Sequence, residues 1–236
     1  MAEGASPLTV DAVMRIVLMG RKGSGRSSSG NSILGENRFT EQECELSEGQ
    51  TQIGHRRVHV LDCPDVLDPD VDKEKLQEQL LSACSAGLSS VLLVVPLVKK
   101  LENEQEMLEF IKDLFGPEVL KCIMILVTHE DEDEARVSQL LQQKVNVDLQ
   151  QLLTECGTKY HCINNKRRSE EQRIHLLQKI EGLMKENRGK LVKRRRGSMG
   201  SFVNCKCVNN VLNKAIIKKI YDSSHMQDLL NLFLMR

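Results

Sequence analysis

The sequence predicts an α/β fold, a three-layer sandwich in which helices cover both faces of a mostly parallel β-sheet. Short apolar runs rich in β-branched residues alternate with amphipathic stretches at helical spacing. The run at residues 90–96 is hydrophobic almost throughout, as expected for a strand that is covered on both faces. Polar residues stand where several of these runs end, and in a parallel sheet such ends collect at one edge, where ligands bind.

The predicted elements follow one another regularly along the chain. Strands are predicted at residues 14–19, 57–62, 90–96, 121–127 and 159–163, and helices at 27–34, 73–86, 103–115, 133–156 and 169–187. Glycine and proline mark the helix ends, as at Gly116-Pro117 and at Gly157. Residues 35–54 are polar without a clear period, and we predict that this segment is irregular.

The length of 236 residues suggests one domain with extensions. We predict a flexible leader at residues 1–12, a globular domain at 13–187, and a C-terminal extension at 188–236 with a basic linker and short amphipathic helical segments. The formal net charge is zero, but the extension is strongly basic. A solvated tail is the favoured interpretation, and peripheral contact with an anionic membrane is the functional alternative. Nucleic-acid binding is not expected, because almost no aromatic residues interleave with the basic ones.

The eight cysteines lack the paired spacing of a disulfide framework or of a zinc site. The N-terminus carries no recognisable secretory signal. We therefore expect reduced thiols in a cytoplasmic protein.

The most informative stretch runs from residue 15 to residue 35, where an apolar run, a glycine-rich loop and a helix start succeed one another. It matches the phosphate-loop pattern G-x-x-x-x-G-K-[ST] except that Arg26 stands in place of Lys. Glycines let successive N–H groups point into one concavity, and the helix start adds its own. A glycine-rich turn in an ordinary βα unit is the structural alternative. The predicted phosphate contacts are Gly20, Lys22, Gly23, Ser24, Gly25, Arg26, Ser27 and Ser28.

A metal site is predicted beside this loop. Ser27 is placed to hold Mg²⁺, and Asp62, at the end of a predicted strand, is expected to hold the ion through water. The structural alternative for Asp62 is a cap or turn residue. Asp65 stands where the D-x-x-G pattern has glycine, and a carboxylate directed inward there would repel a γ-phosphate.

A base site is predicted at two later strand ends. Asp131 follows Thr128 and His129, and a carboxylate at this place can accept two N–H bonds from the guanine edge. His129 could cover the base, and Asn164 and its neighbour Asn165 could bond or cover it. The alternative is that the acidic run is only a helix start, where carboxylates favour the helix dipole.

These motifs together resemble the AIG1-type GTPases of immunity-associated proteins, the GIMAP family. The resemblance covers about residues 13–185 and rests on six runs: Gly20 to Gly35, Asp62 to Asp65, Leu92 to Leu97, Glu104 to Gly116, Val127 to Asp131, and Tyr160 to Asn165. It implies a P-loop GTPase-like fold, binding of GTP or GDP with Mg²⁺, a homodimer or oligomer across the nucleotide face, and an association with intracellular membranes.

Four departures from the family pattern point to a weakened γ-phosphate site. Arg26 and Asp65 are two of them. In the third, Glu41 stands where a switch I Thr is expected and Thr40 is displaced. In the fourth, Lys99 stands where the family has an Arg that could stabilise charge across a dimer, which leaves Lys99 as a weak candidate for a catalytic residue. Loss of an arginine finger costs on the order of 10³ to 10⁵ in rate.

The sequence therefore predicts a guanine-nucleotide-binding switch or scaffold with weak or absent hydrolysis and a preference for GDP. Two alternatives stay open. One is a competent GTPase in which Arg26 replaces the Lys and either Thr40 or Thr51 serves switch I. The other is an interaction module that binds no nucleotide. A P-loop kinase is less favoured, because no lid or acceptor-site pattern is visible.

Overall fold

The computed structural model of the chain describes residues 13–41, 44–101, 103–129 and 147–187. The predicted leader, the C-terminal extension, Asp131 and most of the helix predicted at 133–156 lie outside the described residues.

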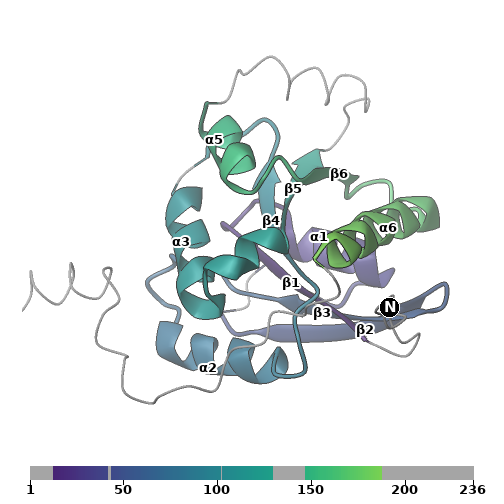
Figure 1. The fold of residues 1–236 in the computed structure, drawn as a ribbon, viewed down its shortest axis with the longest axis horizontal. Coiled ribbons are helices and arrows are strands. Elements are labelled where there is room, and N and C mark those ends of the chain that lie inside the picture. Colours follow the sequence, from purple (N-terminus) through teal and green to yellow (C-terminus); the bar gives the residue numbers. More distant parts are fainter. Residues whose placement is uncertain (1–12, 42–43, 102, 130–146, 188–236) are drawn as a thin grey trace, which may run out of the picture. The chain divides into compact units, whose positions relative to one another are not determined.

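Among the described residues, six strands form one sheet in the order β2-β3-β1-β4-β5-β6 (Figure 1). They are β1 (Met14–Gly20), β2 (Ser47–Ile53), β3 (Arg56–Asp62), β4 (Ser90–Pro96), β5 (Ile123–His129) and β6 (Tyr160–Asn164). Neighbouring strands pair in parallel, except that β2 runs antiparallel to β3. The predicted mostly parallel sheet is confirmed.

Helices cover both faces of this sheet (Figure 1). One face carries α2 (Lys73–Ala83), α3 (Glu104–Phe115) and α5 (Val147–Glu155), and the other carries α1 (Arg26–Leu34) and α6 (Glu170–Glu186); a 3₁₀ turn at Pro117–Lys121 leads into β5. Along β1, Val17 and Met19 belong to the first core, whereas Ile16 and Leu18 belong to the second. Both faces of the central strands are buried, which explains their continuously apolar sequences.

The prediction of an irregular segment at residues 35–54 is wrong in its second half, which forms the edge strand β2. Its buried positions are Gly49 and Ile53, so only one large apolar side chain marks the inner face. A Cβ at Gly49 would lie 2.5 Å from the side chain of Leu34, and the close packing of α1 therefore requires glycine there. The strand is defined by its backbone ladder with β3, which hydrophobic periodicity does not reveal.

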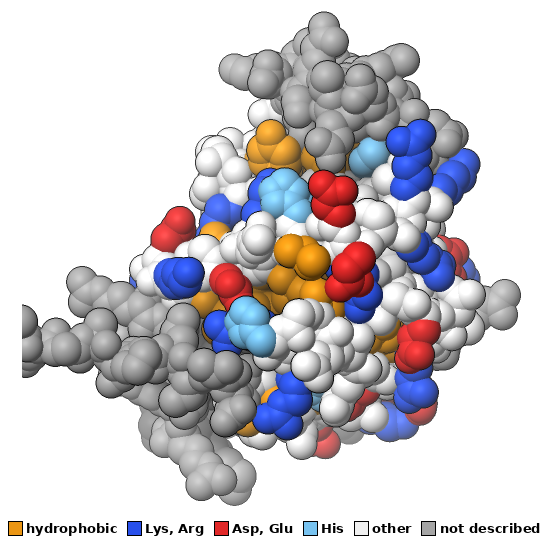
Figure 2. Space-filling model, turned by 90° about the vertical axis from the view of Figure 1, so that its right-hand side faces the viewer, with side chains coloured by type: hydrophobic (Ala, Val, Ile, Leu, Met, Phe, Trp, Pro, Cys, Tyr) orange, Lys and Arg blue, Asp and Glu red, His pale blue; other side chains and the backbone are white. Residues whose placement is uncertain are grey.

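On the face shown in Figure 2, basic and acidic side chains are interspersed, and hydrophobic side chains gather only in small areas between them. Neither sign of charge dominates this face. Within the described part of the chain, no helix has the length and apolar composition that crossing a bilayer requires.

Candidate phosphate-binding site

The carboxyl ends of the parallel strands meet at one edge of the sheet. The strand register aligns Gly20 with Val94, Pro96 with Thr128, and His129 with Asn164. The predicted site residues Gly20, Thr128, His129 and Asn164 therefore lie along this edge, together with Asp62 at the end of β3. The predicted convergence of strand ends is confirmed for the described residues.

The loop between β1 and α1 has the backbone that its glycines predict. Gly23 and Gly25 have φ angles of +76° and +85°, in the left-handed region that favours glycine. Gly25 is also the N-cap residue of α1, and no side chain caps the helix there. The N–H groups of the first helical turn are therefore available to an anion. The Ser24 hydroxyl is buried in this loop and has no hydrogen-bond partner among the described residues.

Two side chains from distant strand ends hold the loop in place. Thr128 Oγ1 donates to the Ser24 carbonyl oxygen at 2.7 Å. Asn165 Nδ2 donates to the Gly25 carbonyl oxygen at 3.2 Å and to Ser29 Oγ at 3.1 Å. Thr128 and Asn165 therefore position the phosphate loop. The sequence predicts only a base contact for Asn165; its place directly after the last strand is the signal for a role at this edge.

Asn164 shapes the turn that follows β6. Its Oδ1 accepts the backbone N–H groups of Lys166 at 2.9 Å and Arg167 at 3.2 Å. Its own backbone N–H donates to Gln172 Oε1 at 2.8 Å, which ties the turn to α6. The side chain thus has a structural role at the place where a base contact is predicted, and Asp131, the other predicted base contact, lies outside the described residues.

The Arg26 side chain is turned into the site and paired with Asp62. Arg26 is only 6% exposed, and its Nε lies 2.7 Å from Asp62 Oδ1. Its Nη1 donates to the Gly20 carbonyl oxygen at 3.1 Å, and its Nη2 donates to Ser27 Oγ at 3.4 Å. The guanidinium group therefore contacts both of the residues predicted to hold Mg²⁺.

Asp65 is directed toward the phosphate loop. Its Oδ2 accepts the backbone N–H of Lys22 at 3.0 Å, and its Oδ1 lies 3.2 Å from Arg21 Nη1. Oδ1 also accepts the N–H of Leu67 at 3.0 Å, which closes the turn after β3. The inward orientation considered in the sequence analysis is the one that the structure shows, with Arg21 as a partner that the sequence analysis did not identify.

Lys99 also reaches the phosphate loop, where its Nζ donates to the Gly23 carbonyl oxygen at 3.2 Å. Thr40, in contrast, is exposed. The segment before it is held against α1 by Asn31, whose Oδ1 accepts the Phe39 N–H at 2.7 Å. Thr51 is on β2, where its hydroxyl accepts a bond from Arg173 on α6 at 3.3 Å. The structure therefore does not bring Thr51 to the loop.

Comparison with known proteins gives the family. The model of the AIG1 family matches residues 14–209, most of the chain. The chain belongs to the AIG1 family. It is 28% identical over 193 residues to immune-associated nucleotide-binding protein 9 of Arabidopsis thaliana, a match that covers 74% of this chain and 56% of the relative. It is 29% identical over 189 residues to GTPase IMAP family member 8 of Homo sapiens, covering 75% of this chain and 28% of that protein.

The AIG1 domain shares its fold with P-loop GTPases. The structure of Toc33 from Arabidopsis thaliana in complex with GDP and Mg²⁺ matches with a TM-score of 0.57 at 17% identity, covering 77% of this chain and 87% of that one. LeoA, a bacterial dynamin GTPase from ETEC, matches with a TM-score of 0.55 at 18% identity, covering 94% of this chain and 43% of that one. The predicted fold class and the resemblance to the GIMAP family are thus both confirmed.

The AIG1 domain as it stands does not fit Mg²⁺ at the predicted position. Mg²⁺ requires oxygen ligands at about 2.0–2.1 Å in a nearly octahedral arrangement. Here an oxygen of each residue predicted to hold the metal, Ser27 Oγ and Asp62 Oδ1, contacts the Arg26 guanidinium. A second cation at the same oxygens would be repelled by the first.

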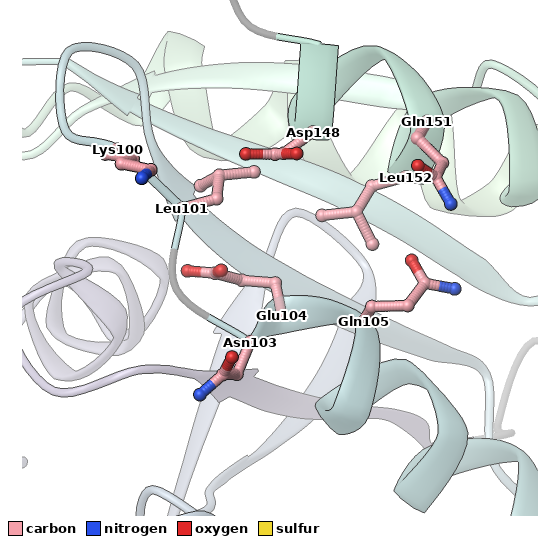
Figure 3. A pocket seen from close by; sticks show the side chains of 8 residues that line it. All are labelled: Lys100, Leu101, Asn103, Glu104, Gln105, Asp148, Gln151 and Leu152. Atoms are coloured by element: carbon pink, nitrogen blue, oxygen red, sulfur yellow. The ribbon is translucent and has the colours of Figure 1, made fainter.

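A pocket of about 480 Å³ lies between α3 and α5 (Figure 3), and its lining residue Lys100 directly follows Lys99. Its lining runs from Lys100 and Leu101 through the first turn of α3 to Gln151 and Leu152 on α5. No residue predicted to contact nucleotide lines it.

Proposed function

We propose that this AIG1 domain binds guanine nucleotides at the loop of residues 20–28 and holds GDP more tightly than GTP. It acts as a switch or scaffold with weak or absent hydrolysis. The left-handed glycines and the uncapped start of α1 support the phosphate part of this proposal. The complex of Toc33 with GDP and Mg²⁺ is an example of such binding on the same fold.

The preference for a diphosphate rests on Asp65, which is the single observation that carries the proposal. Its buried carboxylate already occupies the N–H of Lys22, a loop donor otherwise open to a phosphate oxygen. A terminal phosphate that approaches this end of the loop meets the fixed negative charge of Asp65. It also cannot bond to the Lys22 N–H while Asp65 accepts that hydrogen bond. The Arg21 partner reduces that repulsion, but it is itself held by the carboxylate.

Weak hydrolysis follows from the groups around the outer end of the loop. Lys99 brings a positive charge to Gly23 but lacks the planar, bidentate fork with which Arg stabilises a transferring phosphoryl group. Thr40, the displaced candidate for switch I, is exposed, and the segment leading to it is anchored to α1 by Asn31. Neither group supplies the full set of γ-phosphate contacts.

The proposed partners are guanine nucleotide and a second copy of this chain. For the chloroplast translocon components atToc33 and psToc159, dimerization is important for the GTPase activity. In this chain Val98, which is 80% exposed, stands beside Lys99 next to the loop and would be covered by a partner across the nucleotide face. A cytoplasmic location, with peripheral membrane contact through the basic tail and without nucleic-acid binding, is proposed from the sequence alone.

Calorimetric titration of nucleotide-stripped protein tests the proposal. GDP, ADP and a non-hydrolysable GTP analogue are compared in buffer containing Mg²⁺, with the Asp131→Ala variant as a control for guanine recognition. We expect binding of GDP, weaker binding of the analogue, and loss of GDP binding in the variant. Equal binding of both guanine nucleotides, with turnover that rises with protein concentration, would support a competent GTPase. Absence of heat with folded protein would leave an interaction module that binds no nucleotide.

A further inference from the structure

We propose that Arg26 is the built-in cation of the phosphate site, so that this domain binds guanosine diphosphate without Mg²⁺. The inference rests on the proposed nucleotide binding and concerns which positive charge neutralises the phosphates. It follows from the disagreement between the Mg²⁺ that the fold family uses and the residues present in this chain.

The position of the guanidinium group is the first step. Arg26 and Asp62 form a buried pair at 2.7 Å, with side chains 7% and 3% exposed. The same guanidinium contacts the Gly20 carbonyl oxygen and Ser27 Oγ, so three separate groups hold it in the site. The planar fork of Arg can satisfy three acceptors lying in different directions, whereas the compact ammonium of Lys leaves the neighbouring oxygens to a metal ion.

The available donors are the second step. A guanidinium group has five N–H donors. Within the described part of the chain, three of them bond to Asp62, Gly20 and Ser27, which leaves two for phosphate oxygens. A phosphate at the start of α1 therefore meets a fixed positive charge as well as the backbone N–H groups of the loop. The positive charge that Mg²⁺ supplies in the fold family is already present.

The cost of admitting a metal is the third step. Mg²⁺ at Ser27 and Asp62 would require the guanidinium to leave both oxygens, and it would then remain as a buried cation beside a dication. Asp62 cannot neutralise both charges. Arg26 and Mg²⁺ thus compete for the carboxylate of Asp62. The guanidinium has the advantage because it is part of the chain and is always present at the site.

The test compares GDP binding to the full chain in buffer with Mg²⁺ and in buffer with EDTA. For the wild-type protein we expect dissociation constants that agree within about twofold, because a factor of two is well below the loss of one charge-assisted contact. The Arg26→Lys variant frees the oxygens for a metal, and its affinity in Mg²⁺ should exceed that in EDTA by about tenfold or more. Arg56→Lys is the matched control, because Arg56 forms a 2.7 Å pair with Glu181 away from the site.

The outcomes separate the two proposals. Wild-type binding of GDP that requires Mg²⁺ overturns the inference and leaves the proposed function intact. Absence of GDP binding in both buffers overturns the proposed function, and the inference with it. If Arg26→Lys does not fold, Mn²⁺ with GDP provides the second measurement on the wild-type protein. The free Mn²⁺ signal of a Mn²⁺–GDP mixture, followed by electron paramagnetic resonance, should not fall when the protein is added, and a further fall on adding the protein contradicts the inference.

Discussion

The carboxylate of Asp65 accepts a hydrogen bond of 3.0 Å from the backbone N–H of Lys22, which joins the turn after β3 to the phosphate loop. The same carboxylate pairs with Arg21 at 3.2 Å. In the D-x-x-G pattern this position is a glycine, which offers an N–H group to the γ-phosphate and no side chain. The exchange keeps the backbone N–H but adds a negative charge, and it does so at a buried position where screening by solvent is weak.

Asp65→Asn should raise the affinity for a GTP analogue relative to GDP. The amide oxygen can still accept the Lys22 N–H, while the negative charge is removed. We expect the dissociation constant of the GTP analogue, divided by that of GDP, to fall by about tenfold, equivalent to about 1.4 kcal/mol. Asp68→Asn is the control, since it removes the same charge from a residue whose carboxylate bonds within its own turn. A nucleotide preference that stays the same in Asp65→Asn would show that this carboxylate does not set it.

Gly30→Ala should destabilise the domain, although alanine is the better helix former. A Cβ at Gly30 would lie 2.6 Å from Phe39 Cδ2 and 2.9 Å from Leu18 Cδ1, so the core must shift to admit it. We expect a loss of about 1–3 kcal/mol in the free energy of unfolding. Gly182→Ala in α6 meets nothing within 4 Å and should stabilise by about 0.5–1 kcal/mol. Urea unfolding of both variants measures the difference, and shifts of the same sign would contradict the packing argument.

His161 should make the domain less stable as the pH falls below neutrality. Burial, and then the positive charge of Lys179 and the ring of His175, lower its pKa from the ordinary 6.5 to about 3. Below pH 6.5 the unfolded chain takes up a proton at this residue, whereas the folded chain does not until about pH 3. Proton uptake by His161 in the unfolded chain therefore lowers the free energy of unfolding progressively as the pH falls from 6.5 to about 3. Above pH 6.5 this residue does not change the stability.

Unfolding midpoints measured from pH 7.5 down to about pH 5 test this expectation, since the ordinary pKa of histidine lies in that range. The decline should be shallower in His161→Leu than in the wild-type protein. His55→Gln, at an exposed position in the turn between β2 and β3, should leave the slope unchanged. An equally steep decline in His161→Leu would assign the pH dependence to other groups.

Much of the fold could be predicted because its signals are local in sequence. The apolar run of β4 and the stripe of Leu76 and Leu80 on α2 report burial through their own spacing, and both elements are observed. β2 could not be predicted in this way. It lies at the edge of the sheet with Gly49 on its inner face, and what defines it is its pairing with β3. Contacts between segments distant in sequence were likewise not predictable at the site. The sequence places Asn165 at the edge of the sheet where the parallel strands end, but it does not reveal the bonds of Asn165 to Gly25 and Ser29.

The sequence by itself determined which charges stand around the phosphate loop, because the glycine spacing and the strand ends place Arg26, Asp62 and Asp65 at one edge. Only the tertiary structure decided which of them pair. Arg26 meets Asp62 across 36 positions of sequence, and Asp65 meets Lys22 across 43, because β1 and β3 lie side by side in parallel register. A side chain's charge is a property of its residue type, whereas its direction depends on the neighbours that the folded sheet brings to it. Those directions bring Arg26 onto both residues predicted to hold Mg²⁺ and turn Asp65 toward the phosphate loop.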